Sequence, residues 1–196
     1  LLVLDIDTGK FTPVPNLPKG PKSHPRWSPN GRYIAYAGRE GVDWTYSTEN
    51  LELWVCDARH GRAKCLSNKT DWCLMAATLS DTSEASFESW IDWPSNDHIL
   101  TRIGWHGETH VARFDRTGKT KPRLMTLGRV VITPGNISAD GKRLVATLDQ
   151  PTAPCEIHVG RLSATTINLK KRTNFNDEFV KTHSIAKPTT HWIRSE

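Results

Sequence analysis

The chain has 196 residues, 37% of them hydrophobic and 24% charged, and a formal net charge of +5. This composition excludes an intrinsically disordered protein, and the length suffices for one domain with a substantial core. No apolar run approaches the roughly 18 residues of a membrane helix. The basic residues are spread along the chain and do not form the stripe typical of nucleic-acid binding. We therefore expect a soluble domain that has neither a membrane nor a nucleic acid as its partner.

The first segment predicts a β-hairpin. Residues 1–5 alternate as a strand, Asp5 to Lys10 form a turn, and Phe11 to Val14 leads out of it. An aspartate opens such a turn by accepting hydrogen bonds from the backbone ahead of it, and a glycine closes the turn at positive φ. The same pattern returns in residues 51–66 and 110–126. We call these three reversals the Asp-Gly turns.

A second kind of reversal alternates with the Asp-Gly turns. The sequence Ser28-Pro29-Asn30-Gly31 separates a strand that ends at Trp27 from an alternating strand that begins at Tyr33. Related phrases occur in residues 91–100 and 136–145. Asn-Gly and similar pairs tolerate the positive φ angles of tight hairpins. Three copies of one reversal, which we call the repeated tips, predict a repeat protein.

Joined in order, the two kinds of reversal give four-stranded antiparallel units, which predict an all-β fold. The 44 residues from Trp93 to Ile137 fit one blade of a β-propeller, and the 66 residues from Trp27 to Trp93 leave room for an insertion. We expect a β-propeller fragment of about three and a half blades. Its predicted parts are a half blade at 1–14 and blades at about 23–66, 89–126 and 130–171.

The two ends of the chain indicate an incomplete propeller. Closed propellers have typically 4–8 blades, so three and a half blades leave strand edges open, and we expect self-association through these edges. Leu1 reads as part of a strand with no leader before it, which is typical of a piece of a longer chain. We expect residues 1–176 to form the partial propeller and residues 177–196 to leave it, with Thr190 to Ile193 as a last strand.

Several side chains allow a structural and a functional interpretation. Trp27 and Trp93 stand at the repeated strand end, where blades pack, and we predict that both belong to the core. His106 and His110 have the spacing of metal ligands, but the Gly-Glu pair between them favours a turn that joins two strands. We expect no metal site and no cofactor.

The four cysteines include no Cys-x-x-Cys pair, so their spacing does not predict a zinc site. Cys56 and Cys65 could face each other across a hairpin and form a disulfide. The alternative is a set of free, buried thiols in a reducing compartment. We expect a cytoplasmic protein on this second interpretation, while a secreted or periplasmic protein remains the alternative.

The blade phrases and the closing stretch resemble the propeller of the prolyl oligopeptidase family of serine peptidases. The resemblance is to its acylaminoacyl-peptidase and dipeptidyl-peptidase-like branch. The match runs from Ile137 to Lys142, through Thr152 to Val159, and on to Arg172 to Asn176, which is similar to the family's last blade and its exit. Ile185 to Ser195 is similar to the strand that leads into the catalytic domain.

The resemblance implies an α/β-hydrolase domain in the same protein, capped by a propeller that admits short peptides by size. Such a domain carries the Ser-His-Asp triad and needs a Gly-x-Ser-x-Gly elbow between a strand and a helix. No such elbow occurs in these 196 residues. We therefore expect no catalytic residue in this chain and no hydrolysis by the chain alone.

Two long connections, residues 38–50 and 68–88, interrupt the blade pattern and are unusual unless functional or disordered. Trp44 and Trp72 either anchor these connections or contact a ligand. Glu84 and Glu88 are either solvated carboxylates or, as the dipeptidyl branch implies, groups that hold the free amino terminus of a peptide. The adjacent Glu-Glu pair of that branch does not occur here. All four residues are our substrate-facing candidates.

Two hypotheses follow from the sequence. The chain is either the non-catalytic propeller of a serine peptidase that acts on short peptides, or a stand-alone propeller of the Tol-system type that binds other proteins. The carboxyl end distinguishes the two hypotheses, because an interaction propeller would usually close its ring with a strand from the opposite terminus. Residues 185–196 instead point onward, as in the peptidase family.

Overall fold

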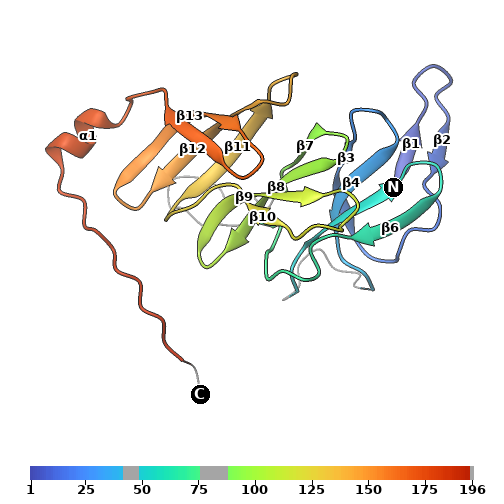
Figure 1. The fold of residues 1–196 in the computed structure, drawn as a ribbon, viewed down its shortest axis with the longest axis horizontal. Helices are drawn as coiled ribbons and strands as arrows, with labels where there is room; N and C mark the ends of the chain where they lie inside the picture. Colours follow the sequence, from blue (N-terminus) through green and yellow to red (C-terminus); the bar gives the residue numbers. More distant parts are fainter. Residues whose placement is uncertain (42–48, 76–87, 195–196) are drawn as a thin grey trace.

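The computed structural model describes residues 1–41, 49–75 and 88–194 (Figure 1). Over these residues the chain is almost entirely β-structure, which confirms the predicted fold class. The first two strands, β1 (Leu2–Leu4) and β2 (Phe11–Pro13), form an antiparallel hairpin. This is the hairpin that the first Asp-Gly turn predicts.

A four-stranded antiparallel sheet follows the hairpin, with its strands in chain order. The strands are β3 (Lys22–Trp27), β4 (Tyr33–Gly38), β5 (Glu52–Asp57) and β6 (Gly61–Cys65). The inner strand β5 is buried on both faces: Leu53 and Val55 pack toward the next blade, while Trp54 and Cys56 pack toward the hairpin. The two-residue period of a strand thus lets one apolar segment serve two cores.

The next eight strands form one sheet in which two blades are joined. The strands are β7 (Ile91–Ser95), β8 (His98–Trp105), β9 (Glu108–Asp115), β10 (Arg123–Leu124), β11 (Val131–Ile137), β12 (Arg143–Gln150), β13 (Ala153–Leu162) and β14 (Ile167–Lys171). Their order is β14-β13-β12-β11-β9-β8-β7, with β10 beside β9. The blades meet where Val131 of β11 pairs in parallel with Thr109 of β9.

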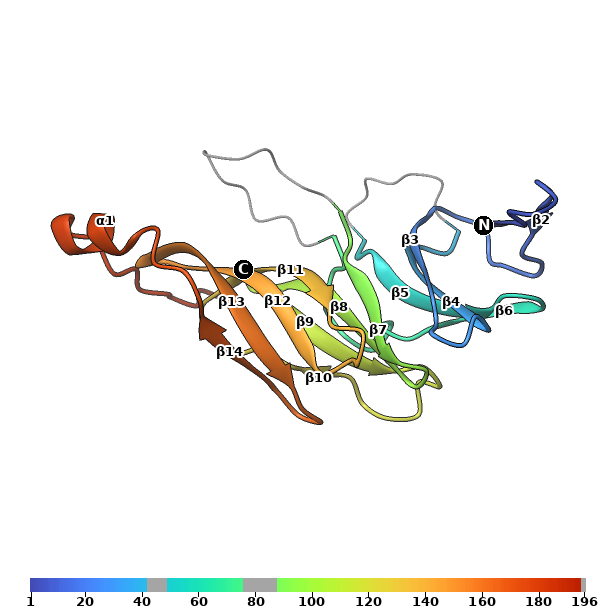
Figure 2. The ribbon, with the colours of Figure 1, turned by 90° about the horizontal axis from the view of Figure 1, so that it is seen from above.

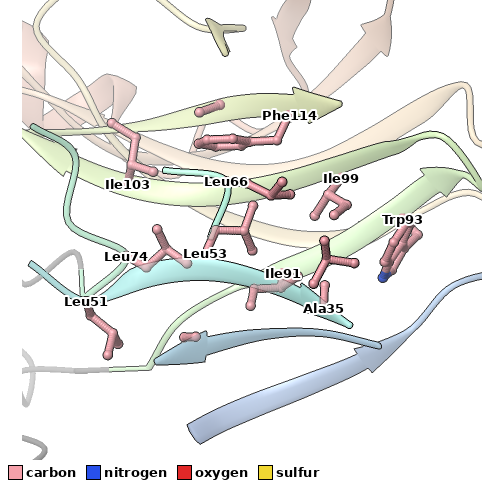
Figure 3. Close-up of a cluster of buried hydrophobic side chains, with 13 residues drawn as sticks. Ala35, Leu51, Leu53, Leu66, Leu74, Ile91, Trp93, Ile99, Ile103 and Phe114 are labelled. Carbon is pink, nitrogen blue, oxygen red and sulfur yellow. The ribbon is translucent and has the colours of Figure 1, made fainter. Parts of the chain in front are cut away.

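Three apolar cores lie between successive blades, which follow one another along the molecule (Figure 2). The first core joins β4 and β5 to β7, β8 and β9 and contains Leu53, Ile99 and Phe114, all almost fully buried (Figure 3). The second core lies between the two joined blades, and the third lies between the hairpin and β4 and β5. Each core thus buries the facing sides of two neighbouring units, as a propeller requires.

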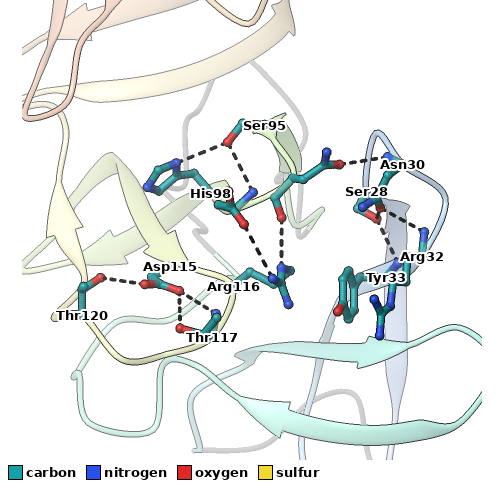
Figure 4. Close-up of polar contacts among 12 residues, drawn as sticks. Ser28, Asn30, Arg32, Tyr33, Ser95, His98, Asp115, Arg116, Thr117 and Thr120 are labelled. Atoms are coloured by element: carbon teal, nitrogen blue, oxygen red, sulfur yellow. Dashed lines mark hydrogen bonds and ion pairs between the residues drawn. The ribbon is translucent and has the colours of Figure 1, made fainter.

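The first and third repeated tips are built by the same hydrogen bonds. The Ser28 hydroxyl donates to Asn30 Oδ1 at 2.8 Å and accepts from the backbone N–H of Tyr33 at 2.9 Å (Figure 4). In the third tip, the Ser138 hydroxyl donates to Asp140 Oδ1 at 2.6 Å and accepts from the N–H of Arg143 at 2.9 Å. The recurring sequence therefore encodes one recurring turn.

The three Asp-Gly turns also match their prediction. The carboxylate of Asp57 accepts hydrogen bonds from the N–H groups of Arg59 and His60, both at 3.0 Å. Asp5 and Asp115 bind the backbone ahead of them in the same way. The closing glycines have φ angles of +63° to +70°, and they are Gly9, Gly61 and Gly118.

Polar contacts link the tips of the first two blades (Figure 4). The backbone N–H of Asn30 donates to Asn96 Oδ1 at 2.9 Å. Arg116 donates through Nε to the carbonyl of Asn96 at 3.0 Å and lies over the ring of Tyr33, 4.1 Å from its centroid. These contacts fix the position of one blade relative to the next at the rim.

The two tryptophans of the repeated strand end differ. Trp93 is buried, and its indole Nε1 donates to the carbonyl of Arg26 in β3 at 3.1 Å. Trp27 is 48% exposed, so its assignment to the core is wrong. Trp93 covers the inner strand of the preceding blade, whereas the short hairpin before β3 supplies no such strand for Trp27 in the described part of the chain.

The end of the chain differs from the prediction in two ways. A short helix, α1 (Asp177–Thr182), follows the last strand and buries no residue. Thr190 to Ile193 is irregular, so the predicted last strand is wrong. A strand needs a neighbouring edge, and the contacts of this segment run instead through side chains: Arg129 donates to the Pro188 carbonyl at 3.0 Å and to the Thr190 hydroxyl at 2.5 Å.

All four cysteines are free thiols, so of the two alternatives left open for Cys56 and Cys65 the structure has the free thiols. Cys65 lies opposite Trp54 in the register of β5 and β6, whereas Cys56 lies opposite Ile34 of β4. Burial raises the pKa of both thiols to about 11, which leaves them protonated at neutral pH.

No helix among the described residues has the length and apolar character needed to cross a membrane.

Candidate functional site

The ends of the two long connections come together at one edge of the first two blades. The segment 71–75 lies between the end of the first connection and the end of β8. The N–H of Leu74 donates to the carbonyl of Leu51 at 2.8 Å, and Cys73 and Gly104 exchange two backbone hydrogen bonds. Asn50 Nδ2 also donates to Asp71 Oδ1 at 3.0 Å. We call this edge the connection site.

A buried arginine holds the end of the first connection. Arg39, which directly follows β4, is 3% exposed. Its guanidinium donates to the carbonyl of Glu49 at 2.6 and 3.0 Å and to the carbonyl of Asn50 at 3.3 Å. Because several donors of one planar group bind adjacent carbonyls, the chain is fixed where it enters β5.

A second buried arginine holds the end of the other connection. Arg102 of β8 is 7% exposed, and its Nη2 donates to the carbonyl of Glu88 at 2.6 Å. Burial lowers the pKa of this guanidinium, and the negative charge of Glu88 opposes that effect. The Nε of Arg102 has no hydrogen-bond partner among the described residues. Each arginine thus fixes the backbone at the end of one long connection.

The structure describes two of the four substrate-facing candidates. Trp72 is half-buried at the first core and meets the ring of Phe114 edge-on, with centroids 6.0 Å apart and an interplanar angle of 89°. This contact anchors the connection. Glu88 is exposed at the connection site, beside the guanidinium that binds its carbonyl. Trp44 and Glu84 lie outside the described residues.

The two histidines with ligand-like spacing have different surroundings. His106 forms the predicted turn between β8 and β9 at a φ of +54°, and its ring stacks on Trp105 with centroids 4.1 Å apart. His110 is buried in β9, where its Nε2 lies 3.0 Å from Glu108 Oε2. The ring of Trp192 meets His106 edge-on at 4.8 Å. His106 therefore connects the carboxyl end of the chain to the second blade.

A buried carboxylate anchors the segment that leaves the last blade. Glu156 of β13 accepts hydrogen bonds from the Thr173 hydroxyl and, at 2.8 Å, from the backbone N–H of Asn176. Lys171 Nζ lies 3.8 Å from the same carboxyl group. Burial opposes ionisation, but these hydrogen bonds and the positive charge hold the pKa of Glu156 below its usual range.

Glu156, Thr173 and Asn176 lie in the stretches that carry the family resemblance, but their sequence does not predict this role. The interaction joins residues 17 and 20 positions apart, so no local pattern could reveal it. The two buried arginines were missed for the same reason. Arg39 has one sequence signal, its position at the start of a long connection, whereas Arg102 lies 14 positions from Glu88 and has none.

The fold and the sequence lead to one class of protein. No protein-family model matches the chain. The chain is similar in structure to TolB from Acinetobacter baumannii, with a TM-score of 0.59 and 16% identity over 88% of this chain and 37% of that one. It is also similar to the β-propeller domain of the Trilobed protease from Pyrococcus furiosus, with a TM-score of 0.56 and 14% identity over 86% and 44% of the two chains. The chain is a β-propeller fragment.

A relative with a curated description narrows this class. The chain is 27% identical over 138 residues to the uncharacterized peptidase YuxL of Bacillus subtilis (strain 168). The match covers 70% of this chain and 20% of YuxL, so the chain spans a small part of that relative. Together with the propeller fold, this similarity supports a peptidase-family propeller, in agreement with the resemblance stated from the sequence.

Proposed function

We propose that this chain is the substrate-gating, non-catalytic propeller of a serine peptidase that acts on short peptides. The observation that carries this proposal is the sequence similarity to a peptidase. The same chain has a propeller fold, and its sequence contains no Gly-x-Ser-x-Gly elbow. On this proposal an α/β-hydrolase domain of the same protein supplies the Ser-His-Asp triad.

The segment after the last blade supports a partner domain in the same protein. Glu156 fixes its first residues, and the helix that follows buries none of its side chains. Large apolar side chains are exposed along this segment, and they are Phe175, Phe179, Trp192 and Ile193. Exposed apolar surface of this kind is typical of an interface with another domain.

The connection site supports a gating role on the same proposal. Arg39 and Arg102 hold the ends of the two long connections in place, so the site at that edge is rigid where the structure describes it. Glu88, at this site, would bind the free amino terminus of a peptide through a charge-assisted hydrogen bond. Trp44, Trp72 and Glu84 are proposed as further substrate-facing residues.

The experiment compares peptides of different length and different amino termini with the full-length protein. We expect turnover of short aminoacyl and acylaminoacyl chromogenic substrates, no cleavage of the same sequence inside a folded protein, and no turnover by residues 1–196 alone. Equal cleavage of short and folded substrates would contradict gating. Turnover by the purified 196-residue chain would contradict the non-catalytic role.

The variant Glu88→Gln tests whether Glu88 binds the free amino terminus of a peptide substrate. We expect KM for peptides with a free amino terminus to rise about tenfold, and KM for acylated peptides to stay unchanged. Glu40→Gln is a matched control, because Glu40 is an exposed carboxylate near the start of the first connection. An equal change in KM for both substrate types would contradict the proposed role of Glu88.

A stand-alone binding propeller of the Tol-system type is the second candidate, and the fold that the chain shares with TolB is compatible with it. Both structural similarities lie below 25% identity and show the fold alone. The coding sequence after Glu196 distinguishes the candidates: a downstream Gly-x-Ser-x-Gly elbow supports the peptidase, and a strand that completes the ring supports the binding module.

We propose that the protein is cytoplasmic. Four free thiols, three of them with a raised pKa, suit a reducing compartment. Fractionation of cells that express the full-length protein tests this location, and recovery in the medium or periplasm would contradict it.

A further inference from the structure

Four lysines from two distant segments meet in one groove at the outer strand of the first blade. The groove has a volume of about 690 Å³ and lies between β6, the turn that follows it, and the connection from β9 to β10. Two lysines come from each side, and they are Lys64, Lys69, Lys119 and Lys121. All four are exposed, and none of the described residues that line the groove is acidic.

The two sides of the groove are fixed to each other and to their own turns. Lys64 Nζ donates to the carbonyl of Thr117, and Gly118, at a φ of +63°, lies so close that a Cβ there would be 3.0 Å from the end of Lys64. Thr70 and Thr120 are held by hydrogen bonds to Ser67 and Asp115. A groove that is rigid before binding loses little entropy when it binds.

The groove runs beside an open strand edge. Among the described strands β6 pairs with β5 alone. The N–H of Leu66 donates to Leu53 of β5, so by the alternation of a strand the backbone groups of Ala63 and Cys65 point away from β5. An unpaired edge of this kind can accept an extended peptide as an additional strand.

The lining distinguishes a peptide from a nucleic acid. A single-stranded nucleic acid requires exposed aromatic rings on which its bases stack. The aromatic residue that lines the groove, Trp54, is only 7% exposed, while Leu66 and Pro122 add apolar surface. Strand edge, apolar lining and positive charge together suit an extended chain that carries carboxylates.

We propose that this groove binds an extended acidic peptide segment of a partner protein. The peptide pairs with the outer edge of β6 and places its carboxylates against the four lysines. This site is separate from the connection site and goes beyond the proposed gating role.

The probe is a fluorescein-labelled peptide of alternating Glu and Val residues, measured by anisotropy with the full-length protein. The variant Lys69→Gln, Lys119→Gln, Lys121→Gln removes three groove charges and keeps Lys64, which holds the two sides together. Its control is Lys10→Gln, Lys19→Gln, Lys142→Gln, three exposed lysines outside the groove lining that change the net charge equally. Circular dichroism checks that both variants are folded.

We expect about tenfold weaker binding for the groove variant, unchanged binding for the control, and loss of binding when Gln replaces Glu in the peptide. A peptide that is N-methylated at alternate residues, and so cannot pair with a strand edge, should also bind at least about tenfold more weakly. Equal weakening by the groove and control variants would overturn the proposal. So would unchanged affinity of the N-methylated peptide, or tighter binding of a labelled oligo-dT strand than of the acidic peptide.

Discussion

The hydroxyl of Thr109 binds both backbone polar groups of Ile132. It donates to the Ile132 carbonyl at 3.0 Å and accepts from the Ile132 N–H at 2.7 Å, and both residues are buried. Thr109 lies in β9 and Ile132 in β11, so one side chain joins two blades at the point where their strands run parallel.

Thr109→Val should weaken this junction. The substitution keeps the shape of the side chain and leaves a buried N–H and a buried carbonyl without their partner, which costs about 1–3 kcal/mol. We expect the free energy of unfolding, measured in urea, to fall by this amount. Thr133→Val, at an exposed position of the same strand β11, is the control and should change it by less than about 0.5 kcal/mol. Equal effects of the two variants would contradict the role of Thr109.

Two glycines in equivalent turns provide a matched pair. Gly9 and Gly61 both close Asp-Gly turns at a φ of +70°. A Cβ at Gly9 would meet nothing within 4 Å, whereas one at Gly61 would lie 1.7 Å from the carbonyl oxygen of Pro15. Gly9→Ala should therefore cost only the backbone strain of about 1–2 kcal/mol.

Gly61→Ala should cost more than Gly9→Ala by at least about 2 kcal/mol, because the segment around Pro15 must move away from β6. Thermal unfolding followed by circular dichroism measures both variants. Equal losses would show that the hairpin and the first blade do not pack as the structure has them.

The carboxylate of Asp57 should make folding sensitive to acid. Burial opposes its ionisation, but hydrogen bonds from His60, Arg59 and Arg32 prevail and lower its pKa to about 2. Because the folded pKa lies below the unfolded value of about 3.9, the stabilisation is complete above that value and is lost as the pH falls toward 2. We expect about 1 kcal/mol after allowance for solvent screening.

Urea unfolding of Asp57→Asn and of the unchanged chain between pH 7 and pH 2 measures this contribution. The difference in stability should be largest at pH 7 and should shrink below about pH 4. Asp7→Asn, which alters an exposed carboxylate in the first turn, is the control. A difference that does not depend on pH would contradict the assignment.

Glu156→Gln should loosen the segment that leaves the last blade. A neutral amide binds the Asn176 N–H and the Thr173 hydroxyl less strongly than a carboxylate does. We expect hydrogen exchange at the Asn176 amide to accelerate about tenfold, while amides of the inner strand β12 keep their protection. Glu178→Gln, in the exposed first turn of α1, should leave both unchanged. Uniform acceleration throughout the last blade would show that Glu156 stabilises the blade as a whole.

The parts of the fold that depend on local chemistry could be predicted from the sequence. Ser28 and Asn30 form a tip through bonds to residues at most five positions away, and Asp57 forms its turn over three. The residues of such a turn form hydrogen bonds with one another, so the short sequence is enough to predict the turn. Because the turn sequence recurs, it also predicts the strands between the turns and the class of fold.

Features that depend on distant neighbours could not be predicted in this way. Trp27 and Trp93 occupy the same place in the repeated phrase, yet only Trp93 has an inner strand of a preceding blade to cover. Cys56 and Cys65 lie on adjacent strands, but the register places Cys65 opposite Trp54. Glu156 reaches its partners across a strand and a turn, which no local pattern records.

The most direct test of the proposed function is to label the full-length protein with a fluorophosphonate probe and to locate the modified residue by mass spectrometry. The probe reacts with the activated serine of a Ser-His-Asp triad. Our account predicts one labelled serine, in a Gly-x-Ser-x-Gly sequence outside residues 1–196. An unlabelled full-length protein, or a labelled serine within these residues, would contradict it.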